Sequence, residues 1–150
     1  MREKMEPNQN PRLNRSIPNA TVIPELAYTD VLGAAKWLCE HFGFQERLRI
    51  ADHRVQLNVE TGGAIVVTQR DPASAAIDNA HGVLVRLENI DEHYRKVVSK
   101  GVRIVRPIKS HPYGERQYTA QDFEGHVWTF SQTLDDVDPA TWGGTLINQP

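Results

Sequence analysis

The stretch of this chain with the most chemically active side chains is residues 113–132, YGERQYTAQDFEGHVWTFSQ. It places an acid, a base and a histidine close together in sequence as Glu115, Arg116 and His126. Alternation along a strand would point Glu115 and Arg116 to opposite faces, so they do not form an acid–base pair at one site. We therefore interpret these two charges as solvated or as members of a structural ion pair.

The rest of the sequence offers no familiar catalytic motif either. The sequence contains no glycine-rich phosphate loop, no GxSxG elbow and no CxxC pair. Cys39 is the only cysteine, and its position near the apolar side of a predicted helix indicates a half-buried structural thiol. A single cysteine excludes an internal disulfide and is typical of the reducing cytoplasm, which is the compartment that we predict.

Two arginines are more informative. Arg54 and Arg86 lie on predicted strands, each on the side away from the apolar residues of its strand. If both face a binding site, their guanidinium groups would favour an anionic or hydrogen-bond-accepting ligand. The alternative is a structural role, in which Arg54 or Arg86 pairs with Glu25 or with a partner chain. The sequence leaves both interpretations open.

The bulk properties restrict the kinds of partner. A length of 150 residues suits one domain, and a formal net charge of −2 favours neither nucleic acid nor an anionic membrane as partner. No apolar run approaches the roughly 20 residues of a membrane span. The first residues lack the apolar core of a secretory signal, which agrees with the predicted cytoplasmic location.

The elements that must position these residues occur twice in the same order. Periodicity and turn residues predict a strand, a helix and three antiparallel strands at 22–28, 30–43, 44–51, 53–60 and 64–69. The same elements follow at 82–88, 89–101, 102–108, 115–122 and 126–132, and the second helix begins with the capping-box spacing of Asn89 and Glu92.

This repeat predicts an α+β fold of two tandem βαβββ modules, residues 21–69 and 81–132, that form a curved, mixed, mainly antiparallel sheet. Residues 1–20 are predicted to be a flexible tail and residues 133–150 a C-terminal tail. We expect Trp142 in the latter to pack on this chain or on a partner.

One helix can cover only one face of each four-stranded sheet. The other faces carry polar side chains, and we predict that they line a partly apolar cup for a small molecule. The candidate ligand-binding residues on these faces are Arg54, Gln56, Asn58, Arg86, Glu115, Gln117 and Thr129.

The repeated module resembles the vicinal oxygen chelate superfamily, which includes glyoxalase I, extradiol dioxygenases, and fosfomycin and bleomycin resistance proteins. PELAYTDVLGAAKWLCEHFGF is similar to the opening strand and helix of that family, and PYGERQYTAQDFEGHVWTFSQ to its closing hairpin. The hairpin turn usually reads Asp-Pro-x-Gly, where this chain has Asp122-Phe123-Glu124-Gly125. The ending VDPATWGGTL is also similar to endings of the glyoxalase and bleomycin resistance branch. The resemblance covers about residues 21 to 132 and implies a fold that carries several chemistries.

Members of this family that use a metal hold a divalent ion with His, Glu or Gln side chains, two from each module. Carried over by register, the four positions fall on Ile23, Val67, Gly82 and Thr129, none of which offers an imidazole or a carboxylate. We therefore predict no metal site, no catalytic residue and no cofactor.

Nearby residues are weaker candidates for metal ligands. His81 lies one residue from Gly82 and would point to the opposite face without a bulge. Glu25 and Gln69 are each two residues from the carried-over positions, at the wrong depth. The other histidines are predicted to be solvated: His41, His53, His93, His111 and His126.

The sequence thus predicts a glyoxalase/bleomycin resistance type protein that works without the family metal. It would bind a small organic molecule, such as a polar aromatic or glycopeptide-like compound, and could protect by sequestering an antibiotic or toxin. A homodimer is expected. One alternative is an enzyme of the same superfamily, a metal-dependent lyase, isomerase or dioxygenase that recruits His81 and Glu25. Another is a dimeric interaction module without a small ligand.

Overall fold

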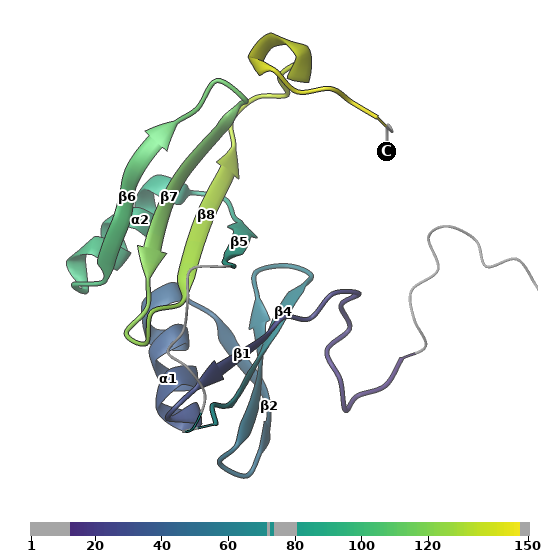
Figure 1. Ribbon diagram of the computed structural model, residues 1–150, viewed down its shortest axis with the longest axis vertical. Coiled ribbons are helices and arrows are strands. Elements are labelled where there is room, and N and C mark those ends of the chain that lie inside the picture. The colour runs from purple at the N-terminus through teal and green to yellow at the C-terminus, as the bar shows by residue number, and fades with distance from the viewer. Residues whose placement is uncertain (1–12, 72, 74–80, 148–150) are drawn as a thin grey trace, which may run out of the picture. The chain divides into compact units, whose positions relative to one another are not determined.

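The computed structural model describes residues 13–71, 73 and 81–147 of the chain. The chain divides into two compact units, with the division between Ser74 and Ala75. Each unit contains a strand, a helix and then three further strands, which confirms the predicted tandem βαβββ modules (Figure 1). Among the described residues, no helix is long and apolar enough to cross a membrane.

The first module is a four-stranded sheet with one helix. Its strands lie in the order β1-β4-β3-β2, with β1 parallel to β4 and the other pairs antiparallel. The elements are β1 (Glu25–Tyr28), α1 (Val31–Phe42), β2 (Gln45–Ile50), β3 (Arg54–Val59) and β4 (Gly63–Gln69).

Helix α1 begins and ends as its sequence predicts. The Asp30 carboxylate accepts a hydrogen bond from the Gly33 amide at 3.0 Å, and Gly43 ends the helix with φ of 81°. The apolar residues at helical spacing along one side of α1 are all buried: Val31, Ala34, Ala35, Leu38 and Phe42. Burial raises the pKa of the Cys39 thiol, as does nearby Glu46, which fits a structural rather than a nucleophilic cysteine.

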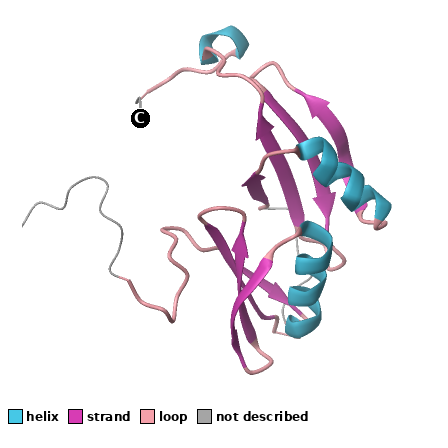
Figure 2. Cartoon of the chain, turned by 180° about the vertical axis from the view of Figure 1, so that it is seen from behind, coloured by secondary structure: helices cyan, strands magenta, loops and turns pink. Residues whose placement is uncertain are grey.

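The second module repeats this arrangement with strand order β5-β8-β7-β6, and here β5 is parallel to β8. In each module the helix lies along one side of its own sheet (Figure 2). The elements are β5 (Val83–Arg86), α2 (Ile90–Ser99), β6 (Arg103–Ser110), β7 (Glu115–Gln121), β8 (Val127–Thr133) and a short 3-10 helix, η1 (Pro139–Trp142).

The predicted capping box at the start of α2 is wrong. Asn89 adopts a left-handed conformation with φ of 56°, and its side chain makes no capping hydrogen bond. The Ile90 amide instead donates to the Gln132 side-chain oxygen at 2.9 Å. A residue distant in sequence has therefore replaced the local cap, which a spacing rule cannot detect.

The core of the second module lies between α2 and the sheet. Trp128 and Phe130 of β8 are both fully buried. Tyr118 stacks on Phe130 with ring centroids 5.2 Å apart, and its hydroxyl is hydrogen-bonded to Nδ1 of His93. His93 is thus a partner of the core and not the solvated residue that its sequence position predicts.

Replacing Tyr118 by phenylalanine should lower the free energy of unfolding by about 1 kcal/mol at neutral pH, because the bond to His93 is lost. Burial, and less strongly Tyr94, raise the pKa of Tyr118. Above about pH 10 this tyrosine ionises in the unfolded chain but not in the folded one, so wild-type stability falls as pH rises. The difference between wild type and Tyr118→Phe should therefore shrink from about pH 9 to about pH 11 in denaturant titrations. A constant difference would contradict the burial argument.

Candidate functional site: the open faces of the two sheets

We call the side of each sheet opposite its helix the open face. In the first module Val55, Leu57 and Val59 are buried on the helix side. Arg54, Gln56 and Asn58 alternate with them and lie opposite Thr68, Val66 and Ala64 of β4. The predicted division of β3 into an apolar and a polar face is therefore confirmed.

Arg54 takes the structural role that the sequence left open. Its guanidinium group lies 2.6 Å from the carboxylate of Glu25 on the first strand, and both residues are on the open face. The two side chains are 37% and 57% exposed, so this ion pair adds little to stability. It does neutralise Arg54, which makes this arginine a weaker anchor for an anionic ligand.

The N-terminal segment Asn14–Pro18 lies against the same face. The Arg47 guanidinium donates to the Arg15 carbonyl oxygen at 2.9 Å and to Gln56 Oε1 at 2.6 Å. The Gln56 amide nitrogen in turn donates to the Ser16 carbonyl oxygen at 2.9 Å. Gln56 is 4% exposed and Pro18 is buried. This part of the predicted tail is thus held by defined contacts, whereas residues 1–12 lie outside the described residues.

The predicted binding residues of the first module therefore differ in availability. Arg54 is paired, Gln56 already binds backbone of the same chain, and Asn58 is exposed without a side-chain hydrogen bond to another described residue.

The open face of the second module carries a connected set of polar side chains. Tyr113 donates its hydroxyl proton to Gln117 Oε1 at 3.0 Å, and the Gln117 amide donates to Ser131 Oγ at 2.9 Å. Ser131 donates onward to Glu115 Oε1 at 2.8 Å although it is only 1% exposed. We call these four residues the β7–β8 network. It brings together two predicted site residues, Glu115 and Gln117, with two that the sequence reading missed.

The remaining predicted residues lie beside this network. Thr119 and Thr129 face each other across β7 and β8 with their hydroxyl oxygens 2.9 Å apart. Arg86 is exposed and donates to the Thr133 hydroxyl at 2.8 Å. Arg86 has no carboxylate partner among the described residues, in contrast to Arg54. Arg116 lies on the helix side, 3.0 Å from Asp91 of α2, which confirms that Glu115 and Arg116 point to opposite faces.

An aromatic cluster borders the network where β6 turns into β7. The Tyr113 ring stacks on His111 with centroids 4.9 Å apart, and Trp142 of η1 lies 5.4 Å from Tyr113. The predicted packing of Trp142 is therefore made with this chain, although its side chain stays 45% exposed. The C-terminal segment is anchored there because the Leu134 amide donates to the Gly114 carbonyl oxygen at 2.8 Å.

Strand β6 adds three cations that alternation did not predict on this face. The pairs Arg103–Gln121, Arg106–Thr119 and Lys109–Gln117 place these cations opposite open-face residues of β7. Two irregularities in the register, one on each side of Arg106, make this possible. Pro107 inside the strand was the one signal of an irregular edge strand in the sequence.

The four positions carried over from metal-using relatives do not fit a divalent cation. Val67 is fully buried and lies opposite Val55, so it belongs to the helix side and its assignment to the open face was wrong. Thr129 is on the open face, but its hydroxyl bonds to Thr119. Ile23 and Gly82 have no donor atom in their side chains.

The substitute ligands do not assemble either. Glu25 is paired with Arg54, and Gln69 bonds to the Thr29 carbonyl oxygen at 2.9 Å. His81 is exposed. His126 is 8% exposed, so its prediction as a solvated histidine was wrong. Within residues 13–71, 73 and 81–147, no three His, Cys, Asp or Glu side chains are grouped in a way that could hold a metal ion.

Comparisons with known proteins agree with this architecture. TioX from Micromonospora sp. ML1 has 35% sequence identity and a TM-score of 0.63, with coverage of 75% of this chain and 97% of that one. A glyoxalase/bleomycin resistance protein/dioxygenase from Nocardioides has 17% identity and a TM-score of 0.63, with coverage of 83% and 87%.

A third similar structure is that of a point mutant of FosX, the genomically encoded fosfomycin resistance protein from Listeria monocytogenes. It is complexed with Mn(II) and 1S,2S-dihydroxypropylphosphonic acid. It has 18% identity and a TM-score of 0.56, with coverage of 72% of this chain and 84% of that one. At this identity, as for the Nocardioides protein, the likeness shows the fold alone. A search of curated proteins found no match. The family profile described as Glyoxalase/Bleomycin resistance protein/Dioxygenase superfamily matches residues 20–130, and the chain therefore belongs to this superfamily.

Proposed function

We propose that this protein binds a small organic molecule on the open face of its second module and does so without the family metal. The observation that carries the proposal is the β7–β8 network of Tyr113, Glu115, Gln117 and Ser131 next to the exposed Trp142. Binding sites for small molecules combine apolar or aromatic walls with a few placed polar groups. A polar aromatic or glycopeptide-like compound offers both kinds of contact.

The donor chemistry of the chain supports binding rather than metal-assisted catalysis. Val67 lies on the helix side, and the other carried-over positions supply Ile23, Gly82 and Thr129, which do not form a ligand set for a divalent ion. If the protein protects a cell from an antibiotic or toxin, sequestration would be sufficient. The homodimer expected for such a protein belongs to the same proposal, and sedimentation analysis would measure it.

Thermal unfolding with and without ligand tests the proposal, because a compound that binds only the folded state raises the melting temperature. Bleomycin and a panel of hydroxylated aromatic compounds are suitable probes. Replacing Gln117 by alanine should weaken binding of a compound that shifts the wild type by about two- to tenfold, the effect of losing one or two hydrogen bonds. Gln45→Ala, on an outer strand of the other module, is the control and should leave affinity unchanged.

Two results would overturn the proposal. One is a panel in which no compound raises the melting temperature, which would favour an interaction module without a small ligand. The other is stoichiometric, tight binding of Ni, Zn, Mn or Fe(II) that is lost in His81→Ala. That result would show that the enzyme alternative uses His81 after all.

A further inference from the structure

The three cations of β6 form a row on the open face of the second module. Arg103, Arg106 and Lys109 lie opposite every second residue of β7, so their Cα atoms follow one another at about 7 Å. A regular strand would point residues three apart to alternate faces. The irregularities on both sides of Arg106 bring all three to the same face, and such bulges commonly re-aim side chains at functional sites.

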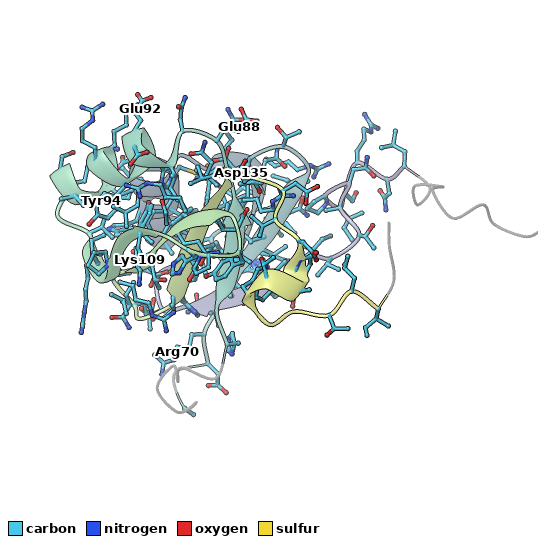
Figure 3. The ribbon with its side chains drawn as sticks, turned by 90° about the horizontal axis from the view of Figure 1, so that it is seen from above. Arg70, Glu88, Glu92, Tyr94, Lys109 and Asp135 are labelled. Atoms are coloured by element: carbon cyan, nitrogen blue, oxygen red, sulfur yellow. The ribbon has the colours of Figure 1, made fainter. Side chains whose placement is uncertain are left out.

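The charge of this row is not neutralised within the described residues. Arg103, Arg106 and Lys109 are exposed, and no described acidic side chain forms an ion pair with them. Figure 3 shows Lys109 well apart from the labelled Glu92 of α2 and from Asp135 of the C-terminal segment. The residues of β7 that face the row are Gln117, Thr119 and Gln121, which are all uncharged.

The open face of this module is therefore positive in a chain whose formal net charge is −2. The sheet residues on this face include four cations, which are the three of the row and Arg86. They include one carboxylate, that of Glu115, which already accepts a hydrogen bond from Ser131. An uneven charge distribution of this kind attracts anions to one face. Protection of an edge strand against aggregation is the competing explanation, but Pro107 and the bulges already provide it.

We infer that the row of Arg103, Arg106 and Lys109 binds the anionic part of a small ligand, such as a carboxylate, sulfate or phosphate group. This inference rests on the proposed function, because it names the charge of the molecule that the open face binds. Gln117 and Thr119 lie beside the row and are uncharged, and their side chains are already bonded to Ser131 and Thr129, so the row itself supplies the groups that contact the anion. The row extends over only about 14 Å of β7, which suits a small multivalent anion better than a long polyanion.

The test uses inorganic pyrophosphate and citrate as probes, titrated into the full chain at constant ionic strength while backbone amide NMR shifts are followed. Pyrophosphate should cause saturable shifts in β6 and β7, and binding should weaken as salt is added. Each of Arg103→Gln, Arg106→Gln and Lys109→Gln should weaken binding by about two- to fivefold, and the triple variant by at least about tenfold. If citrate binds with an affinity similar to that of pyrophosphate, the site also accepts carboxylates. If only pyrophosphate binds, the site is selective for phosphate groups.

Matched variants separate a specific site from general charge. Arg95→Gln removes one exposed cation from α2, on the other side of the sheet, and should leave affinity within about twofold of wild type. Arg106→Lys keeps the charge and should retain most of the binding, while melting temperatures verify that each variant is folded. Equal losses in Arg95→Gln and Arg106→Gln, or shifts spread over the whole chain, would overturn the inference.

The outcome is distinguishable from that of the proposed function. If organic compounds bind but the triple variant and uncharged analogues bind equally well, the inference fails and the proposed function stands. If pyrophosphate binds the row but no organic compound raises the melting temperature, the anion site stands and the proposed function fails. A short single-stranded oligonucleotide that binds much more tightly than pyrophosphate would overturn the assignment to a small ligand.

Discussion

Replacing Asp122 by alanine is expected to lower the free energy of unfolding by about 3–4 kcal/mol, the largest single effect that we predict. The carboxylate is 5% exposed and accepts three hydrogen bonds. One oxygen accepts from the Glu124 amide at 3.1 Å and from the His126 amide at 3.0 Å, and the other accepts from the Trp128 indole at 3.1 Å. The substitution leaves three donors of a tight turn without their acceptor, and one of them is a core side chain.

Urea unfolding followed by tryptophan fluorescence measures this effect, provided that the slope of the transition stays constant. The Asp122→Asn side chain keeps one oxygen as an acceptor, but its NH2 group can then face the indole N–H of Trp128. We therefore expect this variant to lose about half as much free energy of unfolding as Asp122→Ala. The exposed Asp136 is the control, and its replacement by alanine should change stability by less than about 0.5 kcal/mol. A loss below about 1 kcal/mol in Asp122→Ala would contradict the role of this carboxylate as the centre of the turn.

Replacing Arg47 by alanine is expected to release the N-terminal segment from the first sheet. Arg47 links Gln56 to the Arg15 carbonyl oxygen, which belongs to the peptide bond that trypsin would cleave after Arg15. Loss of these hydrogen bonds should favour local opening by about 1–2 kcal/mol, equivalent to a rate of cleavage after Arg15 about 5- to 30-fold higher. Limited proteolysis followed by mass spectrometry measures this rate directly.

The same strand offers a matched control. Arg49 is also an arginine of β2, but its guanidinium group pairs with Glu46 at 2.6 Å and makes no hydrogen bond to the described part of the N-terminal segment. Arg49→Ala should therefore leave the cleavage rate after Arg15 close to that of wild type. If Arg47→Ala behaves in the same way, the segment is not held by this arginine.

Much of the fold could be predicted because the relevant signals are local. Asp30 and Gly43 mark the ends of α1, and alternation assigns Val55 and Leu57 to the helix side of β3. The repeated order of elements identified the two modules, whose strand limits agree with the structure within a few residues. Each of these inferences depends on neighbours in the chain, which the sequence shows directly.

The predictions that failed depend on contacts between distant segments. Asn89 has the right spacing for a cap, but Gln132 on β8 supplies the hydrogen bond. Counting along the chain placed Val67 at a metal position on the open face, but its pairing with Val55 puts it on the helix side. His93 was assigned to a helix surface as a solvated residue, while it is half-buried and hydrogen-bonded to the Tyr118 hydroxyl of the core. Spacing along one element does not reveal what a second element contributes.

By itself, the sequence determined the paired βαβββ modules and the polar and apolar sides of β3 and β8. Only the tertiary structure decided how the polar side chains are used. It pairs Arg54 with Glu25, covers Gln56 with the N-terminal segment, and aligns the cations of β6 on the open face. The physical reason is that ion pairs, hydrogen bonds and bulges depend on strand register and on close approach in space, which alternation within a single strand does not specify.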